Sequence, residues 1–138
     1  MQAGAVSFNG DIRPILADRC FACHGPDSAA RKAGLRLDRE EFAKAALAES
    51  GTVPVVAGKP NQSGIIHRIT SDDPDEIMPP QEAKSELTPV EIELMKKWIA
   101  EGAEWERHWS FISPKQLTLP AVKNKDWIRN EIDYFILS

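Results

Sequence analysis

The stretch from Asp18 to Asp27 reads DRCFACHGPD, and it contains both cysteines of the chain, Cys20 and Cys23, with His24 directly behind the second. Residues three apart on a helical turn point to the same side of that turn. The two thiols can therefore each form a thioether bond to one vinyl group of a single haem, while the histidine supplies an imidazole nitrogen to the iron. The C-x-x-C-H spacing is a signal for c-type haem attachment. It predicts one covalently bound haem c per chain.

Three other interpretations of this stretch are weaker. A thioredoxin-like C-x-x-C motif requires a βαβ context, whereas the flanking pattern here indicates a helix followed by a loop. A structural zinc site requires four ligands, and the remaining histidines, His67 and His108, are isolated in the sequence. Two unrelated buried cysteines would leave His24 unexplained. Haem is therefore the favoured interpretation.

The composition argues against two classes of partner. The chain of 138 residues has a net charge of −4, which provides no global basic face for nucleic acid. No apolar run approaches the ~20 residues that a membrane-spanning helix needs. The first residues, MQAGAVSF, lack the basic and apolar regions of a signal peptide. An apolar fraction of 42% is ordinary for a soluble globular domain.

Local sequence patterns predict three helices before Met78. The first extends from about Phe8 to Cys20, and Pro14 within it predicts an irregular first turn and a regular part from about Arg13. An alanine-rich segment, 39–49, predicts a second helix, for which Asp38 and Glu41 would form a capping box. Ser63 is the candidate N-cap of a third, shorter helix, which contains three isoleucines: Ile65, Ile66 and Ile69.

The strongest helix signal lies between Thr88 and Gly102. Thr88 is the expected N-cap, Pro89 takes the first helical position, Glu91 completes a capping box, and Gly102 ends the helix. Its predicted buried face consists of Leu94, Met95, Trp98 and Ile99. Every helix predicted here agrees with the all-α fold class that we expect for this chain.

A six-coordinate haem needs a second axial ligand, and four side chains qualify. Met95 lies in the periodic helix, where a core position is expected, and His67 and His108 are expected to face water or the edge of the core. Met78 precedes Pro79 and Pro80, which hold it extended and stiffen its loop. Met78 is therefore the predicted sixth ligand, with His67 as the alternative.

After the helix that Gly102 ends, the character of the chain changes. We expect the haem-binding domain to span residues 1–105 and an extended aromatic tail to span 106–138. The segment 127–136 has an apolar stripe at helical spacing. This stripe favours a chain that continues into a following domain, and the alternative is a helix that packs on the core of this domain.

Several motifs in order resemble a known family. CFACH after an N-terminal helix, a methionine in an MPP loop, and LTPVEIELMKKWIAEGA resemble a class I cytochrome c. The fuller pattern resembles the cytochrome c domain of large planctomycete multidomain proteins, and it extends over nearly the whole chain from Val6. It comprises DIRPIL, CFACHGPD, GLRLD, AGKPNQSGIIHRI and MPP, then HWSF and LPAVKNKDWIRNEIDYFI.

The resemblance implies a small class I cytochrome c fold, in which N- and C-terminal helices cross around a covalent haem. It implies Cys20 and Cys23 as attachment points, His24 as proximal ligand and Met78 as distal ligand. At the helix crossing, Gly10 is expected to let Trp98 approach. The candidates for the apolar haem wall are Leu35, Leu37, Ile77 and Ile99.

The expected function is one-electron transfer through a His/Met-ligated haem, serving a redox partner or a catalytic domain of the parent polypeptide. Asp72, Asp73, Asp75 and Glu76 precede Met78, and they would lower the reduction potential unless they form only a solvated loop. We expect this domain not to be a catalyst on its own and to be monomeric. Because haem attachment in the family occurs outside the bacterial cytoplasm, we expect an extracytoplasmic, periplasmic location.

Two other functions compete with electron transfer. A haem sensor or haem enzyme would have a labile distal ligand and an open sixth site, and His67 and Arg68 are then candidate distal groups. An interaction module without haem would use the aromatic tail as a docking surface.

Overall fold

The computed structural model describes residues 5–83, 85–107, 110, 113 and 118–138, and every regular element assigned in these ranges is helical. The predicted all-α fold is confirmed for this part of the chain. In chain order the elements are η1 (Phe8–Ile12), α1 (Arg13–Arg19), α2 (Phe21–His24), α3 (Glu40–Ala43), η2 (Pro60–Gln62), α4 (Gly64–Ile69), η3 (Gln81–Ala83), α5 (Pro89–Ala100) and α6 (Glu131–Ile136).

The first helix begins irregularly, as predicted. Element η1 is a π-helical turn, capped by Ser7, whose Oγ accepts a hydrogen bond from Gly10 N at 3.1 Å. Regular α-helix starts at Arg13, and Pro14 lies in its first turn, where the missing N–H is not needed. The predicted start near Arg13 is confirmed.

Helix α5 has the predicted ends. Thr88 N donates to Glu91 Oε2 at 2.6 Å, and Glu91 N donates to Thr88 Oγ1 at 3.2 Å, which completes the capping box. Gly102 follows the helix with a φ of +113°, a conformation that glycine adopts without a Cβ penalty. Local chemistry alone determines these boundaries.

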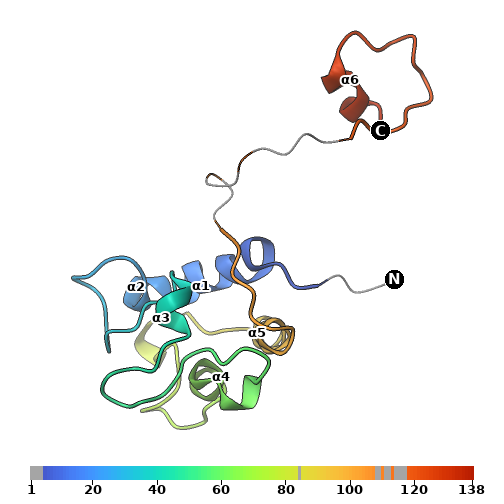
Figure 1. Ribbon diagram of the computed structural model, residues 1–138. Helices are drawn as coiled ribbons and strands as arrows, with labels where there is room; N and C mark the ends of the chain where they lie inside the picture. The colour runs from blue at the N-terminus through green and yellow to red at the C-terminus, as the bar shows by residue number, and fades with distance from the viewer. Residues whose placement is uncertain (1–4, 84, 108–109, 111–112, 114–117) are drawn as a thin grey trace.

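The core lies where α5 crosses the first helix. In Figure 1, α5 is seen nearly along its axis, while α1 runs across the view. Trp98 of α5 packs its ring against Phe8, with centroids 5.7 Å apart, and against Trp105, with centroids 5.1 Å apart. The buried cluster consists of Phe8, Ile12, Ile15, Leu16, Leu37, Ala43, Val55, Ile65, Ile66, Ile69, Met95, Trp98, Ile99 and Ala103.

Gly10 does not have its predicted role at this crossing. A Cβ added to Gly10 would meet only Ser7, at 3.3 Å from Oγ and 3.6 Å from Cβ. Trp98 instead contacts Phe8, which lies two positions earlier on η1. The π-helical turn changes which side chains of η1 face α5. The expected approach of Trp98 to Gly10 therefore does not occur.

The predicted helix over 39–49 is wrong beyond its first turn. Only Glu40–Ala43 is helical, and the hydrogen-bonding groups that would continue it are used elsewhere. Ala43 O accepts from Val55 N at 2.9 Å, and Leu47 N donates to Thr52 O at 2.9 Å. Tertiary contacts to the following loop therefore replace the local helix.

Two predicted caps are also wrong. Asp38 does not cap α3, because its carboxylate pairs with the Arg36 guanidinium, with Oδ1 3.0 Å from Nε. Ser63 precedes α4, but its hydroxyl accepts from Val56 N at 2.9 Å and donates to Lys59 O at 3.0 Å. Ser63 is fully buried and organises the preceding loop instead.

Within the described part of the tail, α6 is the assigned helix. Asn130 caps α6, with its Oδ1 accepting from Ile132 N at 2.8 Å. Figure 1 shows α6 apart from the other helices, and the buried core cluster contains no residue of the tail. The predicted boundary after residue 105 and the following domain stay predictions, and the HWSF motif lies largely outside the described residues.

No helix within the described ranges combines the length and apolarity that crossing a membrane requires.

Glu106 ties the start of the tail to the start of the first helix. Its carboxylate accepts hydrogen bonds from Ser7 Oγ at 3.0 Å, Phe8 N at 3.2 Å and Asn9 N at 3.3 Å. The N–H groups at a helix start have no partner within the helix, and a carboxylate there also complements the helix dipole. Glu106 therefore acts as a cap supplied from about a hundred residues away.

Replacing Glu106 by alanine is expected to lower the free energy of unfolding by about 0.5–2 kcal/mol, the usual cost of removing a helix cap. Thermal unfolding followed by circular dichroism measures the change. Glu104→Ala, which removes a neighbouring carboxylate without this capping role, is the control. Equal destabilisation by both substitutions would contradict the assignment.

Candidate functional site

The C-x-x-C-H motif forms one helical turn. Cys20 O accepts hydrogen bonds from Cys23 N at 3.1 Å and from His24 N at 2.8 Å. Cys20 itself, with φ −124° and ψ −36°, separates α1 from α2. Both cysteines are free thiols and are partly buried. The turn therefore brings the backbones of Cys20, Cys23 and His24 together, and their role in haem attachment stays a prediction.

The environment of His24 favours the neutral form of its imidazole. Burial lowers its pKa below the ordinary value, and an interaction with the Lys32 backbone opposes part of that change. Its Nδ1 is buried and has no hydrogen-bond partner among the described residues. A neutral imidazole is the form that binds metals. A buried nitrogen without a partner requires a physical explanation, and a bound group is one such explanation.

The thiol of Cys20 lies in an environment that disfavours the thiolate. Burial raises its pKa to about 12, and the positive charge of Arg19 opposes this only in part. Catalytic C-x-x-C motifs of redox enzymes have the opposite property, a lowered thiol pKa. In addition, no three His, Cys, Asp or Glu side chains within the described ranges are grouped so that they could hold a bare metal ion. Two free thiols beside a neutral imidazole instead fit a c-type haem.

The chain after the motif folds back onto it. Lys32 N donates to Cys23 O at 2.9 Å, and Leu37 N donates to His24 O at 2.8 Å. These two bonds place Leu37, which is buried, and Leu35, which is partly buried against the core, beside the motif. Both predicted wall residues therefore lie near His24.

An ion pair fixes the end of this return segment. The Arg36 guanidinium lies between the Asp38 carboxylate and the Phe42 ring, 5.3 Å from the ring centroid. The hydrogen bond from Arg36 lowers the pKa of Asp38 below its ordinary value. Because Arg36 and Asp38 alternate with Leu35 and Leu37, the pair helps to keep the leucines turned toward the interior.

Met78 lies in a segment that is anchored to α4. Its backbone N donates to Arg68 O at 2.9 Å, and Arg68 Nη1 donates to Glu76 O at 3.2 Å. Met78 and Ile77 are both partly buried. Ile99, in contrast, has no exposed surface and belongs to the core at the helix crossing. In Figure 1 the segment that follows α4 reaches the left-hand side of the view, where α2 also lies.

The other candidate axial ligands make contacts elsewhere in the protein or lie outside the described residues. Met95 has no exposed surface and packs within the core. His67 is exposed, and its Nε2 lies 2.9 Å from Asn61 O. His108 lies outside the described residues.

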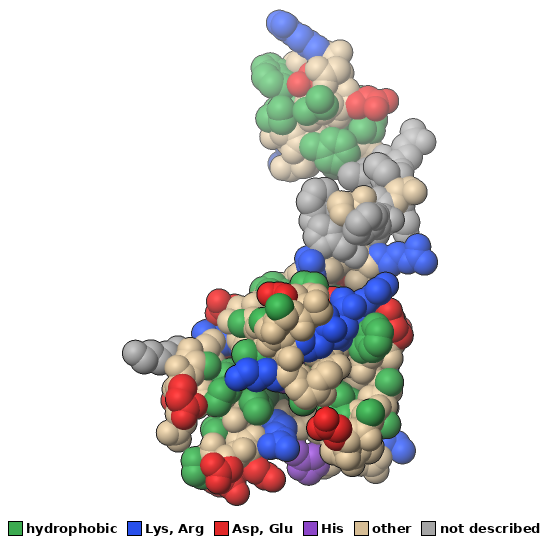
Figure 2. All heavy atoms as spheres, turned by 90° about the vertical axis from the view of Figure 1, so that its left-hand side faces the viewer, with side chains coloured by type: hydrophobic (Ala, Val, Ile, Leu, Met, Phe, Trp, Pro, Cys, Tyr) green, Lys and Arg blue, Asp and Glu red, His purple; other side chains and the backbone are tan. Residues whose placement is uncertain are grey.

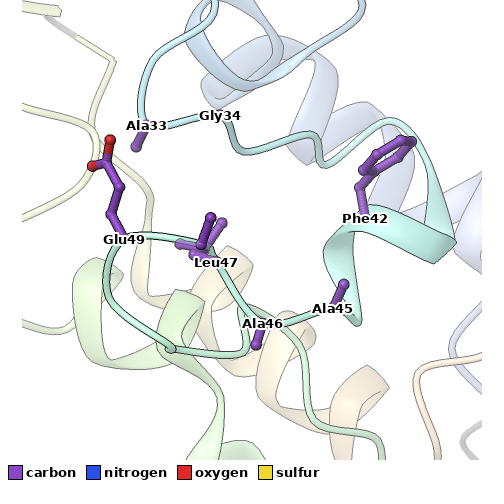
Figure 3. A pocket seen from close by; sticks show the side chains of 8 residues that line it. Ala33, Gly34, Phe42, Ala45, Ala46, Leu47 and Glu49 are labelled. Carbon is purple, nitrogen blue, oxygen red and sulfur yellow. The ribbon is translucent and has the colours of Figure 1, made fainter.

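An open hollow lies next to the return segment but not at the motif. It has a volume of about 190 Å³ and is lined mainly by small and apolar side chains, which Figure 3 shows between the 33–34 turn and the 45–49 loop. Drug-sized ligands fill roughly 300–1,000 Å³, so this hollow alone is too small for a haem. Figure 2 shows the face on this side of the molecule, where hydrophobic side chains are interspersed with basic and acidic ones.

Gly25 is a site residue that the sequence reasoning missed. A Cβ at this position would lie 2.4 Å from Phe21 O and 2.9 Å from Phe21 Cβ. The chain must therefore turn closely across the start of α2, directly after His24, and only glycine permits that approach. The signal available in the sequence was the glycine that immediately follows the motif.

Gly25→Ala is expected to destabilise the protein by about 1–3 kcal/mol, because the added methyl group forces the C-x-x-C-H turn to shift. Thermal unfolding of the purified protein measures the effect. Ala22→Ser, at an exposed position of the same turn, serves as the control and is expected to change stability by less than about 0.5 kcal/mol. A Gly25→Ala protein that melts like the wild type would show that the turn has room for a side chain.

Part of the chain is similar to a family of known proteins. No curated protein and no solved structure matches the chain significantly. Residues 20–82 match the family model described as Planctomycete cytochrome C. The matched segment begins at Cys20 and includes His24 and Met78, and the family implies a covalently bound haem c and haem-based electron transfer. Residues 20–82, slightly less than half of the chain, are therefore similar to the planctomycete cytochrome c family.

Proposed function

We propose that this domain transfers single electrons through one haem c, attached at Cys20 and Cys23, with His24 and Met78 as axial ligands. The observation that carries the proposal is the helical turn in which two free thiols and a neutral, half-buried imidazole are presented together. When bound, the haem iron supplies the Fe(II)/Fe(III) couple. The chain supplies attachment, orientation and exclusion of water.

The case for Met78 as the distal ligand rests on its position in the loop and on the positions of the other candidate ligands. Its loop is anchored at one end by the hydrogen bond to Arg68 O and is stiffened by Pro79 and Pro80. The partly buried Met78 side chain is not a member of the core cluster, whereas Met95 is. A thioether ligand favours the ferrous state relative to a second histidine. If both side chains bound the iron, it would have no place for a substrate, which supports electron transfer as the function.

Carboxylates near the ligand loop would tune the reduction potential. Asp72, Asp73, Asp75 and Glu76 are exposed and precede Met78 directly. Negative charge near the haem stabilises the ferric state, so we propose a potential below that of a well-buried His/Met haem. Solvent weakens each of these interactions, since exposed charges are strongly screened.

The partner of this domain is proposed to be a redox protein or a further domain of the same polypeptide, and the compartment to be extracytoplasmic. The family match supports this location, because haem attachment in cytochromes c takes place outside the bacterial cytoplasm. The domain is proposed to act as a monomer that delivers electrons and to have no catalytic activity of its own.

Met78→Ala is expected to open the sixth coordination position of the holoprotein. Its apparent affinity for imidazole should rise by at least about tenfold, because ~1.4 kcal/mol or more of competition from the thioether is removed. Absorption spectra should show a change from low-spin to mixed or high-spin ferric iron. His67→Ala is the matched control and should leave the spectrum unchanged.

Two results would overturn this assignment in different ways. If His67→Ala opens the iron and Met78→Ala does not, the ligation is bis-histidine. If the wild-type protein already binds carbon monoxide rapidly, the sixth position is open, and a sensor or enzyme function replaces electron transfer.

A further inference from the structure

Arg19, the residue directly before Cys20, has its side chain turned toward the protein. Its side chain is 25% exposed, compared with 55% for Arg39 in a surface ion pair. Nη2 lies 3.4 Å from Glu91 Oε1, and Nη1 lies 3.5 Å from Ser85 Oγ. A third contact, 3.2 Å from Nη1, joins it to the exposed carboxylate of Asp18. Arg19 therefore connects the end of α1 to two residues that follow the Met78 loop.

Both long-range partners lie where the chain returns from the Met78 loop. Ser85 lies between η3 and α5, and its Oγ also donates to Asp18 O at 3.5 Å. Glu91 lies in the first turn of α5, where Oε2 accepts from Thr88 N and Oε1 faces Arg19. Arg19 thus holds the exit of the loop, while the bond from Met78 N to Arg68 O holds its entrance.

The Nε atom of Arg19 gives a second, independent observation. It is buried and has no hydrogen-bond partner among the described residues. Leaving a buried donor unpaired costs free energy. A surface ion pair made only for stability would not require this burial. The Arg19 guanidinium is nevertheless held between the end of α1 and the residues that follow the Met78 loop.

We propose that Arg19 is a positioning residue, which holds the exit of the Met78 loop against the end of α1, directly before the C-x-x-C-H turn. This inference rests on the proposed His24/Met78 ligation. The contacts of 3.4 and 3.5 Å are long for hydrogen bonds, so they act mainly through charge and restrain the loop without locking it. Arg19 thereby sets how readily the Met78 sulfur leaves the iron.

The test measures the rate at which excess imidazole displaces Met78 from the ferric holoprotein, well below the melting temperature. Arg19→Gln and Glu91→Gln are each expected to raise this rate by about tenfold. The glutamine at position 91 keeps an oxygen that can accept from Thr88 N, so the cap survives while the charge facing Arg19 is lost. The Met78–iron charge-transfer absorption band should weaken in both variants.

Two further variants separate positioning from simple stability. Thr88→Ala weakens the start of α5 without touching Arg19, and it should leave the displacement rate near the wild-type value. Arg19→Lys keeps the charge, and it should recover most of the wild-type rate. The double variant Arg19→Gln with Glu91→Gln should be no faster than either single variant, because both remove the same interaction.

The outcomes distinguish this inference from the ligation on which it rests. If Met78→Ala leaves imidazole binding unchanged, the ligation is wrong and this inference fails with it. If Met78→Ala opens the iron but Arg19→Gln and Thr88→Ala, at matched losses of melting temperature, give equal rates, Arg19 is merely structural. If Arg19→Gln does not fold, Glu91→Gln decides, and a wild-type rate in that variant overturns the proposal.

Discussion

The helical turn from Cys20 to His24 is the constraint on which the rest of the structure depends. Two hydrogen bonds to Cys20 O form this turn, and they bring two thiols and an imidazole together before any distant residue is considered. The close passage at Gly25 and the returning bonds from Lys32 and Leu37 then hold it from outside. Attachment of a large planar group needs this rigidity, because both thioether bonds and the axial bond must form on one porphyrin.

The helix crossing gives the turn a fixed base. Trp98 packs between Phe8 and Trp105, and its Nε1 donates to Glu104 O at 3.0 Å, so its single polar group is satisfied. Glu106 then caps the first helix from the far end of the sequence. The start of the first helix and the segment after α5 therefore meet at one place. From there, beside the helix that leads to Cys20, the chain continues into the tail.

Local signals in the sequence were sufficient for some elements. The ends of α5 were predictable because Thr88, Glu91 and Gly102 act through neighbouring backbone groups. The C-x-x-C-H turn was predictable for the same reason. The helix expected over 39–49 failed because Val55 and Thr52 take the backbone bonds that would have continued it, and pairing with Arg36 removes Asp38 from its capping role. Arg19, Gly25 and Glu106 were missed since their importance appears only when segments far apart, or a tight backbone passage, are seen in three dimensions.

The mass of the denatured protein tests the central claim most directly. After expression with a haem-attachment system, the account predicts a chain heavier than the bare 15.4 kDa polypeptide by one haem, with the increment retained under denaturing and reducing conditions. Replacement of Cys20 and Cys23 by alanine should abolish that increment. A wild-type protein with the mass of the unmodified chain would contradict covalent attachment, and the proposed function would fall with it.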